Sequence, residues 1–509
     1  MTKIARFAFV FVVWVGIQMN SLPAAEPQAI SVGDRRELFI DLALTDTLIG
    51  RADLRLHHPV RQEIALLHDA PWEGNACGYH TVFQDDSLYR MTYKAWNIAR
   101  GGDVSNPVVI CYAESRDGIH WIKSDLGLVE FAGSTHNNIL FDQVQGHGCH
   151  DFSPFIDRNP AALPEQRYKA VGFVRGLEED STGLYGFVSA DAIHWHLVQD
   201  DFIIRENGWV FDTQNTAFWS QVEQQYVLYY RKTVNEIRNI ARAVSKDFVH
   251  WEKQGLVDFG MRGPNAREQF YTNQIRPYDR APHLLIGFPA RYCDRGWIRA
   301  TDALPSLELR RDRAKGQLRY GSAVTDALLI SSRDGRRFFR WNEAFLRPGL
   351  RTRHNWAYGD NYIAWHAVET ESAFDDQPRE LSLYATESYF TGDWSRLRRY
   401  TLRLDGFASL YAPAEGGEWI SKPLLFGGNR LELNFATSAA GEIRVELLKA
   451  DGQAIPGFEL EACEPIFGDN LAYTVCWNES SDLSSLQGKP VRLHLILREA
   501  DVFAFRFGE

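Results

Sequence analysis

Five carboxylates occupy matching places in the chain, each at or just before the start of a run of β-type residues. They are Glu73, Asp151, Asp212, Glu268 and Asp360. Carboxylates crowded into one pocket cost free energy unless they share protons, charge or hydrogen bonds, and crowding separates their pKa values. Two carboxyl groups with separated pKa values can serve as general acid and general base. For any single member, capping of a turn is the alternative interpretation.

Polar and aromatic residues near these acids suit the binding of a sugar. Amides bind hydroxyl groups, tryptophan stacks on sugar rings, and arginine neutralises acids or binds a charged sugar. Each also has a structural interpretation: strand capping for the amides, core packing for the tryptophan, and a satisfied buried ring for the histidine. The predicted substrate-binding residues are Glu73, His150, Asn215, Asn273, Arg267, Trp356 and Asp360.

The elements that must position these residues repeat along the chain. The pattern Ser-x-Asp-x-x-His-Trp occurs at residues 115–121, 189–195 and 245–251, and a fourth, weaker copy begins at Ser332. Repeats larger than one solenoid unit and unequal in length are typical of propeller blades with variable loops. We expect the Asp of each copy to cap a turn and the Trp to pack between neighbouring blades.

Four β-type runs per repeat and about five repeats predict an all-β fold with a five-bladed β-propeller over residues 26–403. A propeller gathers one end of each inner strand around a single axis. The five acids are therefore expected to converge there. A basic insertion, residues 291–315, interrupts the fourth unit and is expected to form a short helix or a loop.

The pattern changes near residue 404. Apolar and polar residues alternate in segments 431–435, 443–448 and 491–497, which predicts a C-terminal β-sandwich over residues 404–509. Residues 37–56 also have strand character and are a candidate for the strand that closes the propeller. Of the six cysteines, Cys463 and Cys476 are the most plausible disulfide pair.

The first 25 residues are typical of a secretory signal peptide. Lys3 and Arg6 precede an apolar run, residues 7–17, and small residues follow at 24–25. This run is short for a membrane span, and no second run of spanning length follows. We therefore expect a secreted or periplasmic protein with no membrane span.

Charge and motif content narrow the choice of partners. A formal net charge of −11 argues against nucleic acid, which needs a concentrated basic surface. It also makes a strongly anionic substrate less expected, although a local basic pocket can exist in an acidic protein. The chain has no CxxC, HExxH or EF-hand pattern, so no metal site and no cofactor is predicted, and a structural Ca²⁺ ion stays open.

The repeated turns and the strand-opening acids resemble those of the five-bladed propeller glycoside hydrolases, the group of invertases, levanases and arabinanases. The likeness covers residues 60–400, and the chain looks similar to secreted bacterial family 32-like proteins. The resemblance implies Asp151 as nucleophile or base, Asp212 as the orienting acid and Glu268 as proton donor. A rival set includes Glu73. Arg158-Asn159-Pro160 stands where the family has Arg-Asp-Pro.

These observations favour a secreted glycoside hydrolase that cleaves an oligo- or polysaccharide without an organic cofactor. Two alternatives stay open. One is a carbohydrate-binding propeller in which the acids bind hydroxyl groups or Ca²⁺, and the other is a structural or interaction protein that uses the faces of its blades. Propellers host many functions, so the site has to decide among them.

Overall fold

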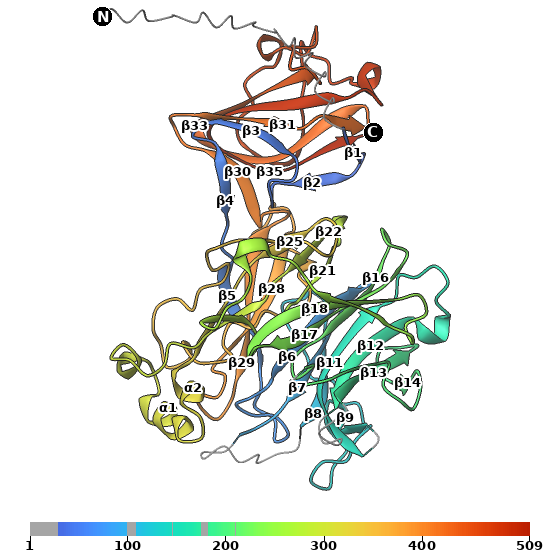
Figure 1. Ribbon diagram of the computed structural model, residues 1–509, viewed down its shortest axis with the longest axis vertical. Helices are drawn as coiled ribbons and strands as arrows, with labels where there is room; N and C mark the ends of the chain where they lie inside the picture. The colour runs from blue at the N-terminus through green and yellow to red at the C-terminus, as the bar shows by residue number, and fades with distance from the viewer. Residues whose placement is uncertain (1–28, 99–107, 145, 175–181, 209) are drawn as a thin grey trace, which may run out of the picture.

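The computed structural model describes residues 29–98, 108–144, 146–174, 182–208 and 210–509. These residues are nearly all in strands and loops, which confirms the predicted all-β class. Their two short α-helices are α1 (Leu307–Ala314) and α2 (Leu318–Ser322). Figure 1 shows a larger lower part and a smaller upper part, and the upper part contains both the first and the last strands. The predicted signal peptide, residues 1–25, lies outside the described ranges.

Five antiparallel sheets follow one another along the larger part (Figure 1). The first contains β6 (Gly78–Asp85), β7 (Leu88–Ala95), β8 (Val109–Ser115) and β9 (Ile139–Phe141). The second contains β10 (Gln143–Val144), β11 (His147–Ile156), β12 (Tyr168–Val174), β13 (Thr182–Ser189), β14 (His196–Leu197) and β15 (Ile204–Glu206). The third contains β16 (Thr216–Ser220), β17 (Gln225–Val234), β18 (Ile237–Ser245) and β19 (Glu252–Leu256).

The fourth sheet is split by an insertion. Its main part contains β21 (Arg276–Tyr278), β22 (Ala281–Gly287), β25 (Ile330–Ser332) and β26 (Phe339–Arg340). A separate small sheet contains β20 (Glu268–Phe270), β23 (Ala290–Cys293) and β24 (Val324–Ala327). Helices α1 and α2 lie between β23 and β24 in the chain, where the sequence predicted a basic helix or loop.

The fifth sheet joins distant parts of the chain. It contains β27 (Val368–Thr370), β28 (Glu380–Glu387), β29 (Arg396–Arg403) and, on its outer edge, β5 (Val60–Leu67). Strand β5 pairs antiparallel with β29. An ion pair of 2.8 Å between Arg61 and Glu387 adds to this pairing. A strand from the start of the chain therefore completes the last sheet.

The N-terminal residues 37–56 do not complete this sheet, and that prediction is wrong. Strands β2 (Arg36–Leu38), β3 (Thr45–Gly50) and β4 (Asp53–Leu56) pair with β35 (Val491–Gly508), β31 (Gly417–Ser421) and β30 (Ala408–Ala412) of the upper part. The reason is apolar burial. Phe39 and Leu44 lie in one core with Trp419 and Leu433 of the C-terminal strands.

The upper part is a single ten-stranded sheet built around two long strands, β33 (Arg430–Lys449) and β35. Its other strands are β1 (Ile30–Gly33), β32 (Leu424–Phe426), β34 (Asp469–Thr474) and the β2–β4 and β30–β31 strands named above. The expected disulfide is not formed, since Cys463 and Cys476 are both free. Within the described part of the chain, no helix has the length and apolar character needed to cross a membrane.

The repeated motif caps a turn, as the sequence predicts. In the second copy one carboxylate oxygen of Asp191 accepts hydrogen bonds from the amides of Ile193 (2.9 Å) and His194 (2.8 Å), and the other faces His194 Nδ1 at 2.7 Å. Asp117 and Asp247 make the same contacts. The motif tryptophans Trp121, Trp195 and Trp251 pack against three different hydrophobic clusters.

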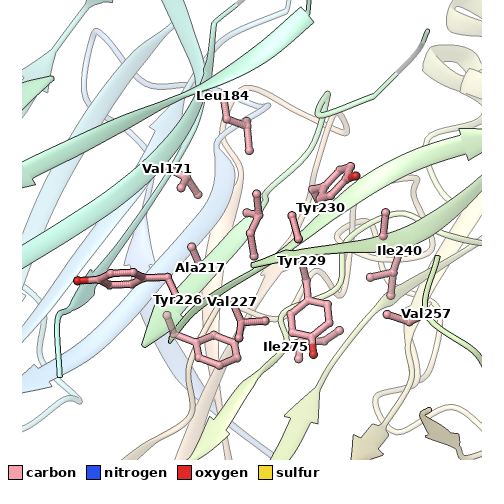
Figure 2. Packing of buried hydrophobic residues seen from close by; sticks show 14 of the residues in the cluster. Val171, Leu184, Ala217, Tyr226, Val227, Tyr229, Tyr230, Ile240, Val257 and Ile275 are labelled. Atoms are coloured by element: carbon pink, nitrogen blue, oxygen red, sulfur yellow. The ribbon is translucent and has the colours of Figure 1, made fainter. Parts of the chain in front are cut away.

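Neighbouring sheets pack face to face through buried side chains. Figure 2 shows one such cluster, in which Val171 and Leu184 of the second sheet lie near Ala217, Tyr229 and Ile240 of the third. All five are buried. This packing fixes the angle between the sheets, and with it the direction in which each inner strand begins.

We expect Asp191→Ala to lower the apparent Tm by about 1–2 °C at pH 7, because a turn cap contributes about 1 kcal/mol. Partial burial acts to raise the pKa of Asp191, but hydrogen bonds from His194 and from nearby amides hold it well below the ordinary value of 3.8. The folded protein therefore binds fewer protons than the unfolded chain near that value. The contribution is present above about pH 4 and is lost as the pH falls further.

Thermal unfolding at one scan rate from pH 3 to pH 7 measures this difference. His194→Ala is the control, since it removes the ring and leaves the backbone caps. A Tm difference for Asp191→Ala that grows as the pH falls below 4 would contradict the capping role.

Candidate active site

The inner ends of four of the five sheets meet through two buried glutamines. Gln214 donates its side-chain amide to the backbone carbonyls of Tyr79 and His80, both at 3.2 Å. Gln274 donates to Gln214 Oε1 at 2.7 Å and to the carbonyl of Ile363 at 2.8 Å. The second sheet joins through Asp151, which accepts two hydrogen bonds from Asn215. The openings of these strands therefore lie close together, although Glu73, Glu268 and Asp360 do not line the same cavity as Asp212.

The backbone is strained at these openings. Tyr79, Phe211, Gln274 and Asn361 have φ values of 55°, 60°, 52° and 61°, in the left-handed region that side chains other than glycine rarely adopt. In this order, the four residues lie at or just before the start of the innermost segment of the first, third, fourth and fifth sheets. Repeated strain of this kind costs free energy and is concentrated at sites that need side chains aimed in unusual directions.

A cavity of about 470 Å³ lies at this meeting point. Its wall is aromatic and basic, with Asp212 and Asp312 as the carboxylates among the described lining residues. It is lined by Tyr79, Lys94, Trp96, Ile98, His150, Asp212, Arg238, Tyr271, Asp312, Arg313, Lys315, Gly316, Arg319, Tyr320, Tyr358, Tyr389 and Phe390. A concave pocket of this size is the usual form of a small-molecule site, although the wall here carries more charged groups than is common.

Asp212 and His150 are neighbours in the wall of this cavity. His150 Nδ1 lies 3.6 Å from one carboxylate oxygen of Asp212, and Arg231 Nη1 lies 3.9 Å from the other. The side chains of His150 and Asp212 are 5% and 12% exposed, so both are nearly enclosed yet reach the cavity. Ion pairs of this kind keep a carboxylate in place for attack or for proton transfer.

Asp151 lies behind this pair, away from solvent. Its side chain is fully buried, and one oxygen faces Asn215 while Oδ1 has no hydrogen-bond partner. Burial raises the pKa of Asp151 well above 3.8, the charge of Asp212 adds to the rise, and the Asn215 hydrogen bonds only partly oppose it. Asp151 and Asp212 therefore have different surroundings, since Asp151 is enclosed and Asp212 lines the cavity.

A group of tyrosines that the sequence analysis missed forms much of the wall. Tyr358 donates to the hydroxyl of Tyr271 at 2.5 Å, and the ring of Tyr362 stacks on that of Tyr271 at 5.2 Å. Arg231 lies 4.2 Å above the Tyr271 ring. Tyrosine is common in strands, so its presence in the sequence is no signal by itself. The sequence feature that could have indicated this wall is the repeated occurrence of tyrosine close to the acids at the strand openings.

The predicted proton donor Glu268 lies elsewhere. It is on β20 in the separate small sheet, where it pairs with Arg340 at 2.7 Å and faces Arg291 at 3.8 Å. It does not line the cavity of Asp212. The assignment assumed that β20 opens the fourth sheet, whereas the segment that reaches the centre begins three residues later, at Tyr271.

Five predicted substrate-binding residues also lie outside this cavity wall: Arg267, Trp356, Asn215, Asn273 and Asp360. Arg267 is exposed, and Trp356 donates its indole hydrogen to the carbonyl of Gly349. Asn273 is buried and bonds Thr216, Ile275 and Tyr229. The contacts of Asn273 have the structural character that was its alternative interpretation.

Asp360 is buried as well, and it accepts hydrogen bonds from the amides of Ala357 and Tyr389. Burial raises its pKa to about 8. It is therefore a capping carboxyl that is held largely protonated near neutral pH. It does not face the cavity of Asp212.

Glu73 lines a second cavity, of about 770 Å³, that adjoins the first. Its carboxylate accepts hydrogen bonds from Lys123 at 2.6 Å and from Tyr93 at 2.5 Å. Burial raises the pKa of Glu73 even though Lys123 opposes the rise. The two cavities share Ile98, Arg313 and Phe390, so they form one groove with two chambers.

No metal site is evident in the described ranges, which contain no group of three or more His, Cys, Asp or Glu side chains placed to hold an ion.

Comparisons with known proteins add a distant likeness. No family model matches the chain. A stretch of 60 residues is 43% identical to the "Uncharacterized protein MT1551" and the "Uncharacterized protein Rv1502" of two Mycobacterium tuberculosis strains. That stretch is 12% of this chain and spans only 20% of the length of each of these relatives.

Solved structures that resemble the chain share little of its sequence. A glycoside hydrolase matches with a TM-score of 0.45 at 12% identity, over 68% of this chain and 92% of its own. An N-acetylgalactosamine deacetylase from F. plautii, in complex with blood group B trisaccharide, matches with a TM-score of 0.44 at 11% identity. The match covers 69% of this chain and 95% of the deacetylase. A thermostable family-43 glycoside hydrolase matches with a TM-score of 0.39 at 10% identity, over 67% of this chain and 95% of its own. At such distances, function has to be inferred from the residues of the cavity.

We expect Asp151→Asn to stabilise the protein increasingly as the pH rises from 4 to 8, by about 2 °C or more in apparent Tm at the upper end. A carboxyl group with a raised folded pKa holds its proton where the unfolded chain has lost it. Folding stability therefore falls as the pH rises above the unfolded value. The amide cannot ionise and keeps an acceptor for Asn215, so it avoids this loss.

Apparent Tm values of the two proteins across that pH range test the prediction. Asn215→Ala serves as the comparison, because it removes the hydrogen bonds and leaves the buried carboxyl group. A Tm difference between Asp151→Asn and the parent that is constant with pH would show that Asp151 is not held protonated.

Proposed function

We propose that the protein is an exported glycoside hydrolase that cleaves an oligo- or polysaccharide bound in the cavity of Asp212. In this proposal the five sheets are the blades of a five-bladed propeller completed by β5, and the ten-stranded sheet is a β-sandwich. The leader-like first 25 residues support export. No cofactor is needed for this chemistry.

The observation that carries the proposal is the enclosed carboxylate of Asp212 in a cavity with aromatic walls. Asp212 is ion-paired and reaches the cavity, whereas Asp151 is buried with a raised pKa. Aromatic rings of Tyr79, Trp96 and Tyr271 line the same space and offer faces for a sugar ring. Enclosed acids beside aromatic walls are well suited to glycosidic chemistry.

In hydrolysis the glycosidic C–O bond breaks, oxygen from water finally bonds to the anomeric carbon, and the leaving oxygen takes a proton. We assign the attack on carbon, or the removal of a proton from water, to Asp212. Asp151 cannot take this role because its carboxyl group has no access to the cavity. Asp151 instead positions Asn215, and through it the segment that carries Asp212.

The proton donor must line the cavity and hold a proton that it can release near neutral pH. Besides Asp212, two described lining side chains have ordinary pKa values below 7, His150 and Asp312. His150 stands beside Asp212, and Asp312 comes from helix α1. Separate His150→Gln and Asp312→Asn variants distinguish the two.

We expect Asp212→Asn to lower turnover by about a hundredfold or more, the usual cost of losing a nucleophile or general base. Glu268→Gln is the matched control, because it also converts a carboxylate to an amide but lies outside the cavity. It should keep turnover within about threefold of the parent. Sugar release by the mature protein from a panel of aryl glycosides and polysaccharides measures both.

Loss of activity in Glu268→Gln with full activity in Asp212→Asn would overturn the assignment of the site. Absence of sugar release from every substrate, together with retention on a polysaccharide gel, would favour a carbohydrate-binding propeller over an enzyme. Apparent Tm values confirm that both variants are folded.

A further inference from the structure

The basic insertion in the fourth unit forms one wall of the cavity. Helices α1 and α2 come from this insertion, and they contribute Arg313, Lys315, Arg319 and Tyr320 to the lining. Lys94 and Arg238 line the cavity from the sheets. Among the described lining residues, five cationic side chains face two carboxylates, Asp212 and Asp312. This balance is opposite to that of the whole chain, which carries −11.

Arg313 lies in this group without a carboxylate partner among the described residues. Among the described residues no Asp or Glu lies within ion-pair distance of its guanidinium, and its buried Nε has no hydrogen-bond partner. The neighbouring Asp312 pairs instead with Lys315, at 3.0 Å. A half-buried guanidinium without an anion pays a desolvation cost that a bound anion would offset.

The position of Arg313 suits recognition of a ligand. Its guanidinium lies 3.8 Å over the ring of Phe390, which holds it flat and leaves its edge for a planar or tetrahedral anion. Both residues line the two chambers, so they stand at the junction of the groove. The second chamber is lined by Asp69, Glu73, Glu308 and Asp393, which would repel an anion.

We propose that the saccharide bound by this protein is anionic, and that Arg313 binds a carboxylate or sulfate ester group of the sugar in the chamber that contains Asp212. This inference rests on the proposed function, because it names the substrate class of the same cavity. Lys315, at the mouth and 79% exposed, adds attraction at longer range. Charge-assisted bidentate binding gives preference for the acidic sugar over its neutral counterpart.

Matched pairs of saccharides test the proposal by calorimetric binding to the full mature protein. One pair is polygalacturonate oligosaccharides and the same oligosaccharides after reduction of their carboxyl groups. The other is a sulfated galactan and its desulfated form. Use of Asp212→Asn beside the parent prevents turnover. We expect the acidic member of at least one pair to bind about ten- to a hundredfold more tightly than the neutral member.

The variants separate Arg313 from a general effect of charge. Arg313→Gln should abolish the preference for the acidic member, and Arg313→Lys should keep part of it. Arg311→Gln is the control, since Arg311 lies on the same helix, is 60% exposed, pairs with Asp302 and does not line the cavity. Lys315→Gln, at an exposed position that cannot affect folding strongly, should weaken the preference and its dependence on salt.

Three results would each overturn the inference. The first is equal binding of the acidic and neutral members in both pairs, and the second is no binding of any of the four saccharides. The third is an equal loss of the preference for the acidic member in Arg311→Gln and Arg313→Gln. Cleavage of neutral saccharides without preference would overturn it and keep the hydrolase. Selective binding of an acidic saccharide that is never cleaved would support it and reject the hydrolase.

Discussion

The burial of polar backbone at the centre of the larger part is the constraint on which the site depends. Inner strands that end in one place leave carbonyl groups without sheet partners, and such groups are costly in a dry interior. Gln214 and Gln274 satisfy the carbonyls of Tyr79, His80 and Ile363 with their side-chain amides. Because one network fixes several openings, the acids and rings that follow them are held in a single arrangement.

This rigid floor contrasts with the wall supplied by the insertion. The sheets position Asp212, His150 and Tyr271 through ladders and buried amides, whereas Arg313 and Lys315 reach the cavity from short helices. Reactive groups need accurate geometry, and a rigid scaffold provides it. Specificity is more easily changed by loops and insertions. The residues proposed for the reaction therefore come from the sheets, and those proposed to select the substrate come from the insertion.

Sequence reasoning succeeded where contacts are local. The Asp of each Ser-x-Asp-x-x-His-Trp turn bonds amides two and three residues away, so its role follows from spacing alone. Convergence of Asp151 and Asp212 followed from their shared place before inner strands. The prediction for Glu268 failed because β20 pairs with β23, which in turn pairs with β24, in a small sheet of their own. The sequence has no signal for that separate pairing. The role of residues 37–56 depends on pairing with strands that lie more than 350 residues away in the chain, for which the sequence also has no signal.

The two central aspartates differ in burial and not in residue type, and this difference gives them different roles in the proposed site. Asp151 and Asp212 have the same side chain and belong to neighbouring sheets, yet of the two only Asp212 lines the cavity. Its oxygens lie 3.6 Å from His150 Nδ1 and 3.9 Å from Arg231 Nη1. Asp151 can stay neutral and hold Asn215 because no solvent reaches it. A neutral carboxyl behind an ion-paired one also avoids repulsion between two adjacent negative charges. The excess of cationic side chains in the cavity wall is compatible with a neutral Asp151. These side chains add attraction for an acidic sugar and do not require Asp151 to be ionised.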